Sequence, residues 1–131
     1  MTTPFGSLSI AASGMTTMKT WIDAISDNVA NANTVKRTSE SAFQARNVIA
    51  ESVPGGAGVR VASIQLSSGD GTLVFDPNSS LADKDGLVRR PNVDLVEQMT
   101  SLIVAQRAYS ANVTVFERAR DSYLRALEIG K

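Results

Sequence analysis

The chain has 131 residues, about the size of one domain, and 43% of them are apolar, which is enough to build a core. Lys plus Arg and Asp plus Glu number 13 each, so the net charge is zero and gives no general attraction to nucleic acid or an anionic membrane. Cys and His are both absent, which excludes disulfides, thiol nucleophiles, Cys/His zinc sites and Ser-His-Asp triads.

The N-terminal stretch differs from a secretory signal peptide. Its first basic residue is Lys19, and ten of the preceding 18 positions are Ser, Thr, Gly or Pro, which leaves no continuous apolar region. No run approaches 18 consecutive apolar residues, so we expect no transmembrane helix. If the protein leaves the cytoplasm, it needs a route that does not use a Sec-type signal.

A heptad repeat predicts a first helix over about residues 7–33. Apolar residues recur at alternating spacings of three and four, as in a coiled-coil seam. They are Leu8, Ala11, Met15, Met18, Ile22, Ile25, Val29 and Ala32. Gly14 and the many Ser and Thr residues lower the intrinsic helix propensity, so packing must supply the stability of this helix.

The middle of the chain, residues 35–91, has the composition of a β-rich or irregular insert. Glycine-rich turns are expected at 54–58 and 67–71, and strand-like runs at 43–50, 59–66 and 72–75. Only two aromatic residues occur here, Phe43 and Phe75, so we do not expect the insert to fold well by itself.

A second long helix is predicted from about Asn92 to Lys131, after Pro91, with Asn92 or Asp94 as its N-cap and Gly130 at its end. A line of mostly apolar positions again has alternating spacings of four and three residues. The line consists of Leu95, Met99, Leu102, Gln106, Tyr109, Val113, Phe116, Arg120, Tyr123 and Leu127. Gln106 and Arg120 interrupt this line, either as a solvated edge or as polar groups that set register between subunits.

The predicted fold is mainly α: long N- and C-terminal helices in an antiparallel coiled coil, with a small β-rich or irregular insert. The helices occupy 1–34 and 92–131, and the insert 35–91. For a single helical hairpin of this composition, the free energy gained by burying apolar side chains is about equal to the conformational entropy cost of ordering the chain. Neighbouring copies would favour the ordered state, which predicts a self-associating protein.

Three stretches carry a resemblance. Ser26–Thr34 has the sequence SDNVANANT, and Pro91–Met99 with Ala105–Asn112 contains NVDLVEQM and AQRAYSAN. Asp76–Val88 contains DP followed by LADKDGLV. The first two resemble the terminal signatures of the flagellar axial proteins, the family of rod, hook and hook-associated subunits. The third is similar to the segment before the C-terminal helix in proximal rod subunits of the basal body, which the length of the chain also suits.

The resemblance implies a structural subunit of the proximal rod, which crosses the periplasm and transmits torque to the hook. It implies export by the flagellar type III apparatus without a cleaved signal peptide. It further implies that the terminal helices pack around a central channel, and that the partners are copies of the chain and other rod proteins. A generic coiled-coil adaptor that binds one partner helix is the alternative.

The residues expected at the assembly interface come from both helices and from the asparagine cluster. They are Leu8, Met15, Met18, Trp21, Ile22, Ile25, Asn28, Val29, Asn31, Asn33, Leu95, Met99, Leu102, Gln106, Tyr109, Asn112, Val113, Phe116, Tyr123 and Leu127. The asparagines either end the first helix as polar caps or fix register between subunits by amide hydrogen bonds. Trp21 is either ordinary core or an interface anchor.

No pattern in the chain indicates catalysis. The sequence of residues 55–58, GGAG, lacks the G-K-[ST] end of a phosphate loop. The sequence of residues 83–86, DKDG, has its Gly at the wrong position for a calcium loop. We therefore expect neither an enzyme nor a cofactor, a metal, a small-molecule substrate or a nucleic acid partner.

Overall fold

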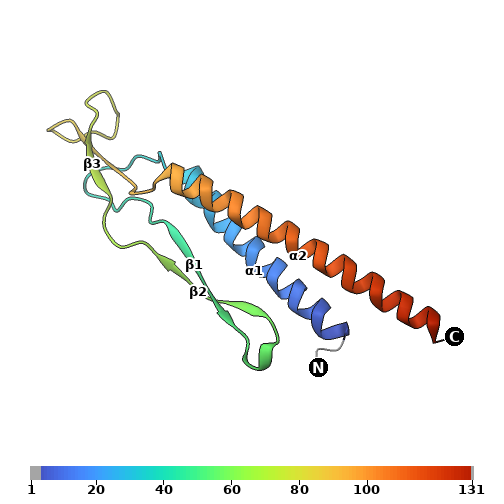
Figure 1. The fold of residues 1–131 in the computed structure, drawn as a ribbon. Coiled ribbons are helices and arrows are strands. Elements are labelled where there is room, and N and C mark those ends of the chain that lie inside the picture. The colour runs from blue at the N-terminus through green and yellow to red at the C-terminus, as the bar shows by residue number, and fades with distance from the viewer. Residues whose placement is uncertain (1–3, 131) are drawn as a thin grey trace. The chain divides into compact units, whose positions relative to one another are not determined.

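A computed structural model describes residues 4–130 and contains two long helices and four short strands (Figure 1). In chain order the elements are α1 (Pro4–Asn31), β1 (Arg46–Ser52), the 3-10 turn η1 (Pro54–Gly56), β2 (Val59–Leu66), β3 (Thr72–Phe75), β4 (Leu87–Arg90) and α2 (Leu95–Ile129). The predicted mainly α fold with a small β insert is confirmed at this level. Residues 1–3 and 131, which belong to the predicted end segments, lie outside the described residues.

The chain forms two compact units, and each takes part of both helices. One contains the residues up to Ile22, Val48–Ser63 and the residues from Ile103 onward. The other contains Asp23–Asn47 and Ile64–Leu102. Each unit is thus built from segments that are far apart in the sequence.

The buried residues of both units are mostly small. In the first unit they include Ala11, Thr17 and Ala105, which are 2% exposed or less. In the second unit the largest fully buried side chains are Ile25, Val88 and Asn28, and the other buried residues are four alanines and Pro91. Small side chains allow helices to approach closely, because interaxial distance depends on the residues at the contact.

Asp94 begins α2. Its Oδ1 accepts hydrogen bonds from the backbone N–H of Val96 at 2.8 Å and of Glu97 at 3.2 Å. The carboxylate thus satisfies two of the unpaired N–H groups of the first turn and interacts favourably with the positive end of the helix dipole. Of the two N-caps left open by the sequence, Asp94 is the one used. The helix ends at Ile129, before Gly130 as predicted.

The strands form two separate two-stranded sheets, β1 with β2 and β3 with β4. The glycine-rich turn predicted at 54–58 joins β1 to β2, and the Val53 N–H donates to the Gly58 carbonyl at 2.8 Å. β3 and β4 are antiparallel, with Val74 opposite the buried Val88. β2 and β3 occupy the predicted ranges 59–66 and 72–75.

Two parts of the insert differ from the prediction. The first strand runs over 46–52 instead of 43–50, because side chains from elsewhere bind the backbone where it was expected to start: the Ala45 N–H donates to Ser67 Oγ at 2.9 Å. β4 was not predicted, since its four residues include two arginines and precede Pro91. Its order comes from β3 and from Lys36, which exchanges two backbone hydrogen bonds of 2.9 Å with Arg89.

A tight turn at 83–86 leads into β4. The Asp83 Oδ1 accepts hydrogen bonds from the backbone N–H of Asp85 and of Leu87, both at 2.9 Å. These bonds, that of Leu87 foremost, and one from the Thr38 hydroxyl lower the pKa of Asp83, although desolvation acts in the opposite direction. Gly86 has φ of +73°, a left-handed conformation that favours glycine.

Candidate assembly and helix-pairing site

The residues predicted at an assembly interface differ widely in their exposure within the single chain. Ile25 and Asn28 are buried. The half-buried ones are Leu8, Met15, Met18, Trp21, Ile22, Val29, Asn31, Leu102, Asn112, Val113, Phe116 and Tyr123. The exposed ones are Asn33, Leu95, Met99, Gln106, Tyr109 and Leu127.

Asn28 is the polar centre of the second unit. Its Oδ1 accepts a hydrogen bond from the Arg46 N–H at 2.7 Å, and its Nδ2 donates to the Arg46 carbonyl at 3.0 Å and to Gln98 Oε1 at 2.9 Å. The residue is 1% exposed, so these bonds replace those that water would make. One side chain of α1 thereby binds both the start of β1 and the first turns of α2.

A salt bridge reinforces the same junction from outside. Arg46 Nη1 lies 2.6 Å from Asp27 Oδ2, and the two side chains are 48% and 50% exposed. An ion pair that is half in water contributes at most about 1 kcal/mol. The register of the junction therefore depends mainly on the buried amide of Asn28.

The other two asparagines of the cluster have different surroundings. Asn31 Nδ2 donates to the Asp27 carbonyl at 2.9 Å, one turn back in the helix, in agreement with a polar helix end. Asn33 is exposed. The hydrogen bonds of Asn28 lie inside one chain, which neither of the alternatives considered for the cluster anticipated.

In the first unit, Gly14 of α1 lies against Asn112 of α2. A Cβ atom added to Gly14 would lie 2.8 Å from both Nδ2 and Oδ1 of Asn112, closer than side chains normally pack. Near the other end of the unit, the rings of Phe5 and Tyr123 meet edge to face, with centroids 4.8 Å apart. Residues early in α1 therefore meet residues late in α2.

Ser13 connects α1 to the β insert within the first unit. Its Oγ donates to the Ile10 carbonyl at 2.7 Å and accepts from the Val59 N–H, the first residue of β2, at 3.1 Å. This contact residue was not predicted from the sequence, and neither were Arg46, Gln98 and Gly14. A serine or glutamine in a helix carries no pattern that marks it as a contact, and Arg46 contacts Asn28 through its backbone.

The line of low exposure on α2 coincides only in part with the predicted line, of which Leu102, Val113, Phe116 and Tyr123 are half-buried. Ala105 is fully buried and Ala108 and Ala119 are half-buried, whereas the predicted Gln106, Tyr109 and Arg120 are exposed. The prediction followed the largest apolar residues, but close approach of helices selects the smallest ones. The exposure of Gln106 and Arg120 agrees with the solvated edge that the sequence left open, and Leu95, Met99, Tyr109 and Leu127 stay exposed in the single chain.

Large apolar residues remain exposed over much of the chain. On α2 they include Val96 at 76%, Met99 at 46% and Ile103 at 52%. Leu66, Leu73 and Phe75 of the strands are also about half exposed or more. Where such residues form a contiguous patch, they are candidates for contact with other proteins.

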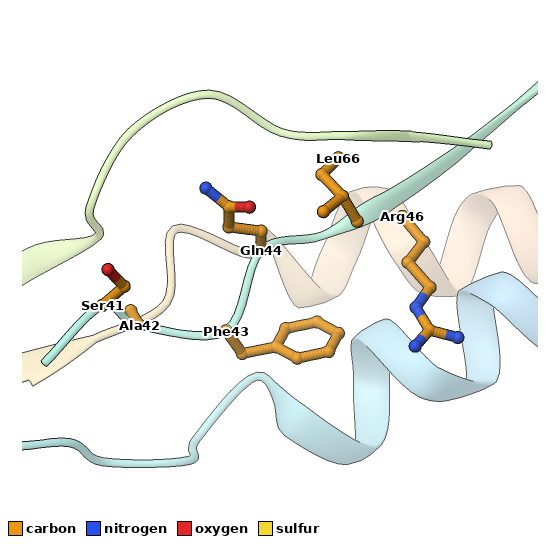
Figure 2. Close-up of a pocket in the computed structure, with 6 residues that line it drawn as sticks. All are labelled: Ser41, Ala42, Phe43, Gln44, Arg46 and Leu66. Atoms are coloured by element: carbon orange, nitrogen blue, oxygen red, sulfur yellow. The ribbon is translucent and has the colours of Figure 1, made fainter.

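Two open cavities have linings without catalytic character. One of about 310 Å³ is lined by residues that Figure 2 labels, Ser41, Ala42, Phe43, Gln44, Arg46 and Leu66. Phe43 and Gln44 point to opposite sides of the chain (Figure 2), and the lone charged group, Arg46, is already paired with Asp27. The other, of about 170 Å³, is apolar and lined by Thr17, Met18, Trp21, Val48 and Ala50.

The described part of the chain has neither a metal-binding cluster nor a membrane-spanning helix. Residues 4–130 hold no group of three or more acidic, His or Cys side chains placed to bind a metal ion. Neither helix in that range is both long enough and apolar enough to span a bilayer. The features that remain are helix contacts and exposed apolar surface.

Comparison with known proteins identifies the family. Residues 8–36 match the family described as flagella basal body rod protein, and residues 84–129 match flagellar basal body rod FlgEFG protein C-terminal. The flagellar basal-body rod protein FlgC of Escherichia coli is 34% identical over 126 residues, which cover 93% of this chain and 94% of that protein. FlgC of Bacillus subtilis is 32% identical over 98% of this chain and 99% of its own length, and FlgC of Borreliella burgdorferi is 34% identical over 95% and 96%. The chain belongs to the family of flagellar basal-body rod proteins, with FlgC proteins among its relatives.

Proposed function

We propose that this chain is a structural subunit of the proximal rod of the bacterial flagellar basal body and that it catalyses no reaction. The observation that carries the proposal is the likeness to rod proteins named FlgC, which extends over 93% or more of this chain and of the three relatives described. A likeness from end to end favours the same role more strongly than a shared terminal motif does.

The terminal helices pair as an antiparallel coiled coil in this proposal. Its support is the order of the contacts in the first unit, where Phe5 meets Tyr123 and Gly14 meets Asn112. In the second unit Asn28 bonds to Gln98. Segments 1–34 and 92–131 thus form the pairing part, and 35–91 the insert.

Assembly uses the surface that pairing leaves open. The predicted interface residues that stay exposed, such as Leu95, Met99 and Leu127, are available to neighbouring copies and to other rod proteins. Because the buried residues are small, one chain alone gains limited free energy from burial. Contacts with neighbours supply the rest, so the helices become fully stable on assembly.

The location and export route follow from this role. As a rod subunit the protein lies in the basal body across the periplasm, lines a central channel and transmits torque to the hook. It leaves the cytoplasm through the flagellar type III apparatus without losing a signal peptide. The polar, glycine-containing N-terminal stretch, with Lys19 as its first charged residue, is compatible with that route.

Deleting the encoding gene in the source bacterium and purifying hook–basal bodies tests the proposal. We expect a non-motile strain without complete rods, restoration by the intact gene, and the full-length chain in wild-type basal bodies by mass spectrometry. Absence of the chain from purified basal bodies would contradict the proposal. A soluble complex that saturates at one partner per chain would favour the adaptor instead.

A further inference from the structure

The β3–β4 pair has one packed face and one open face. Directly opposite residues of an antiparallel pair share a face, and successive residues along a strand alternate between faces. Val74 lies opposite Val88, which is 1% exposed, so their face is packed. Leu73 and Phe75 lie on the other face and are 48% and 69% exposed. This open sheet face therefore presents two large apolar side chains to the outside of the single chain.

Basic residues lie along one side of the open sheet face. Arg89 of β4 lies opposite Leu73, and Lys36 pairs with Arg89 on its other side, so the three share the open face. Arg37 adds a further exposed cation at this basic edge. The Arg89 guanidinium donates to two backbone carbonyls, and within residues 4–130 none of the three cations forms a salt bridge. The segments that meet here, 36–40, 70–73 and 87–90, hold four basic and two acidic residues, so positive charge predominates.

The outer part of α2 carries a surface of the opposite charge. At about 100° of rotation per residue, Glu117, Asp121 and Glu128 lie within about 40° of one another around the helix axis. Leu124, which is 49% exposed, lies about 40° from the middle of this row. All four are about 100° or more from Ala105, which is fully buried. This acidic helix face thus points away from the core and surrounds one apolar side chain with carboxylates.

We propose that the acidic helix face of one copy of this chain docks on the open sheet face of the next copy, with the carboxylates of α2 at the basic edge and Leu124 against Leu73. Asp76 comes directly after Phe75 in the chain, so charge repulsion keeps the helix toward the row that contains Lys36. This inference rests on the proposed rod function and specifies how neighbouring copies meet.

The contact joins two different surfaces, so it is heterologous. Each copy uses its helix face toward one neighbour and its sheet face toward another neighbour. A contact of this kind repeats in one direction and gives an open helical array unless its rotation closes a ring. A shaft built in one direction around a channel requires such a contact, because an isologous contact ends at a closed pair.

A second copy is the partner that the chain itself supports. The two surfaces have opposite charge and each contains an exposed leucine, so docking buries apolar area beside pairs of opposite charges. Another acidic protein would cover the sheet face but leave the helix face open. The contact is made by side chains, because the backbone groups of β3 and β4 already pair with each other.

Reversing the charge of each surface in the full-length protein tests the contact. The helix variant carries Glu117→Lys with Glu128→Lys, and the sheet variant carries Lys36→Glu with Arg37→Glu, all at exposed positions. In analytical ultracentrifugation at low salt, the wild type should grow beyond dimers as its concentration rises. Each variant alone should associate at least about tenfold more weakly. An equimolar mixture should regain association, because each surface of one variant is then opposite in sign to the surface it meets on the other.

Disulfide trapping identifies which surfaces meet. The chain lacks cysteine, so Leu73→Cys and Leu124→Cys each introduce a single thiol. In basal bodies from a strain that makes both variants and no wild type, mild oxidation with copper phenanthroline should give a mixed dimer with one copy of each. Strains with either variant alone should give no dimer, because two sheet faces or two helix faces do not meet. Dimers from a single variant would show an isologous contact and overturn the proposal.

Lys19→Glu with Arg107→Glu reverses two exposed cations outside both surfaces and is the matched control, which should associate as the wild type does. The proposal fails if the wild type does not associate, if the reversed variants associate as tightly as the wild type, or if their mixture is no tighter than either alone. It also fails if the mixed dimer is absent. These results would leave the rod function intact, whereas absence of the wild-type chain from basal bodies would remove the function itself.

Discussion

The side chain of Asn28 holds the backbone of Arg46 from both sides, accepting from its N–H at 2.7 Å and donating to its carbonyl at 3.0 Å. An amide side chain here takes the place that a neighbouring strand would occupy beside β1. The helix thus fixes where the strand begins, and Asn28 belongs to the SDNVANANT stretch that resembles the flagellar axial proteins. In this chain that asparagine has a conformational role.

The first prediction concerns this amide. Asn28→Ala leaves the N–H and carbonyl of Arg46 without their partner, so we expect a loss of about 1–3 kcal/mol in the free energy of unfolding. Chemical denaturation followed by circular dichroism measures it. Asn33→Ala, at an exposed position of the same cluster, should change stability by less than about 0.5 kcal/mol. Equal losses in the two variants would show that the Asn28 bonds contribute nothing.

The second prediction concerns the close contact of Gly14 with Asn112. Gly14→Ala raises helix propensity by about 1 kcal/mol, but its methyl group displaces the Asn112 amide, which donates to the Ala108 carbonyl at 3.0 Å. We expect a smaller gain, or a loss, in the wild-type background and the full gain in an Asn112→Ala background. A double-mutant cycle should give a coupling of at least about 0.5 kcal/mol. Additive effects would mean that the two residues do not touch.

The third prediction separates folding from assembly. Val96→Glu and Met99→Glu alter exposed residues of α2, so each should change monomer stability by less than about 0.5 kcal/mol yet prevent incorporation into basal bodies. Ser122→Glu, at an exposed position about 80° from Val96 and 140° from Met99 around the helix, is the matched control. Normal swimming in strains with the first two variants would remove this face from the assembly interface.

The fourth prediction concerns Ile25, which is 2% exposed and lies on the predicted heptad line. Ile25→Asp buries a carboxylate, so we expect the free energy of unfolding to fall by several kcal/mol. We also expect that the variant is not incorporated into the rod. Ala30→Asp places the same group at an exposed position of α1 and should be tolerated. Thermal unfolding and swimming assays read both effects. A stable, motile Ile25→Asp strain would contradict the assigned core.

The fifth prediction follows from the lowered pKa of Asp83. A carboxyl group whose pKa falls on folding stabilises the protein above its unfolded value of 3.8, and that contribution is lost as pH falls through the folded value. Asp83→Ala should therefore unfold at a lower temperature than the wild type near pH 7, and the difference should shrink below about pH 4. A difference that does not change with pH would contradict the role of the charge. Asp83→Asn, which keeps an oxygen acceptor but not the charge, should show a smaller loss that likewise shrinks below about pH 4.

The helices and the family were predictable from the sequence because both leave repeated signals. The heptad of α1 placed Ala11, Ile25 and Ala32 correctly as buried residues, and the N-cap Asp94 lay in the predicted pair. A periodic pattern depends on one helix alone, so it can be recognised in the sequence without knowing which elements pack against that helix.

Features that depend on a partner element could not be predicted. The alanine line of α2 and the burial of Thr17 follow from how closely the helices approach, and a pattern of large apolar residues does not encode that distance. β4 exists because β3 and Lys36 pair with it. The double role of Asn28 likewise needs the backbone of Arg46, 18 residues away.

Hydrogen–deuterium exchange of the purified chain, dilute and then assembled, tests the central claim most directly. If assembly completes the terminal helices, amides in Pro4–Asn31 and Leu95–Ile129 should exchange at least about tenfold more slowly in the assembled form. Amides of the β3–β4 pair should change little. Helices that are already fully protected in the dilute chain and unchanged on assembly would contradict the account.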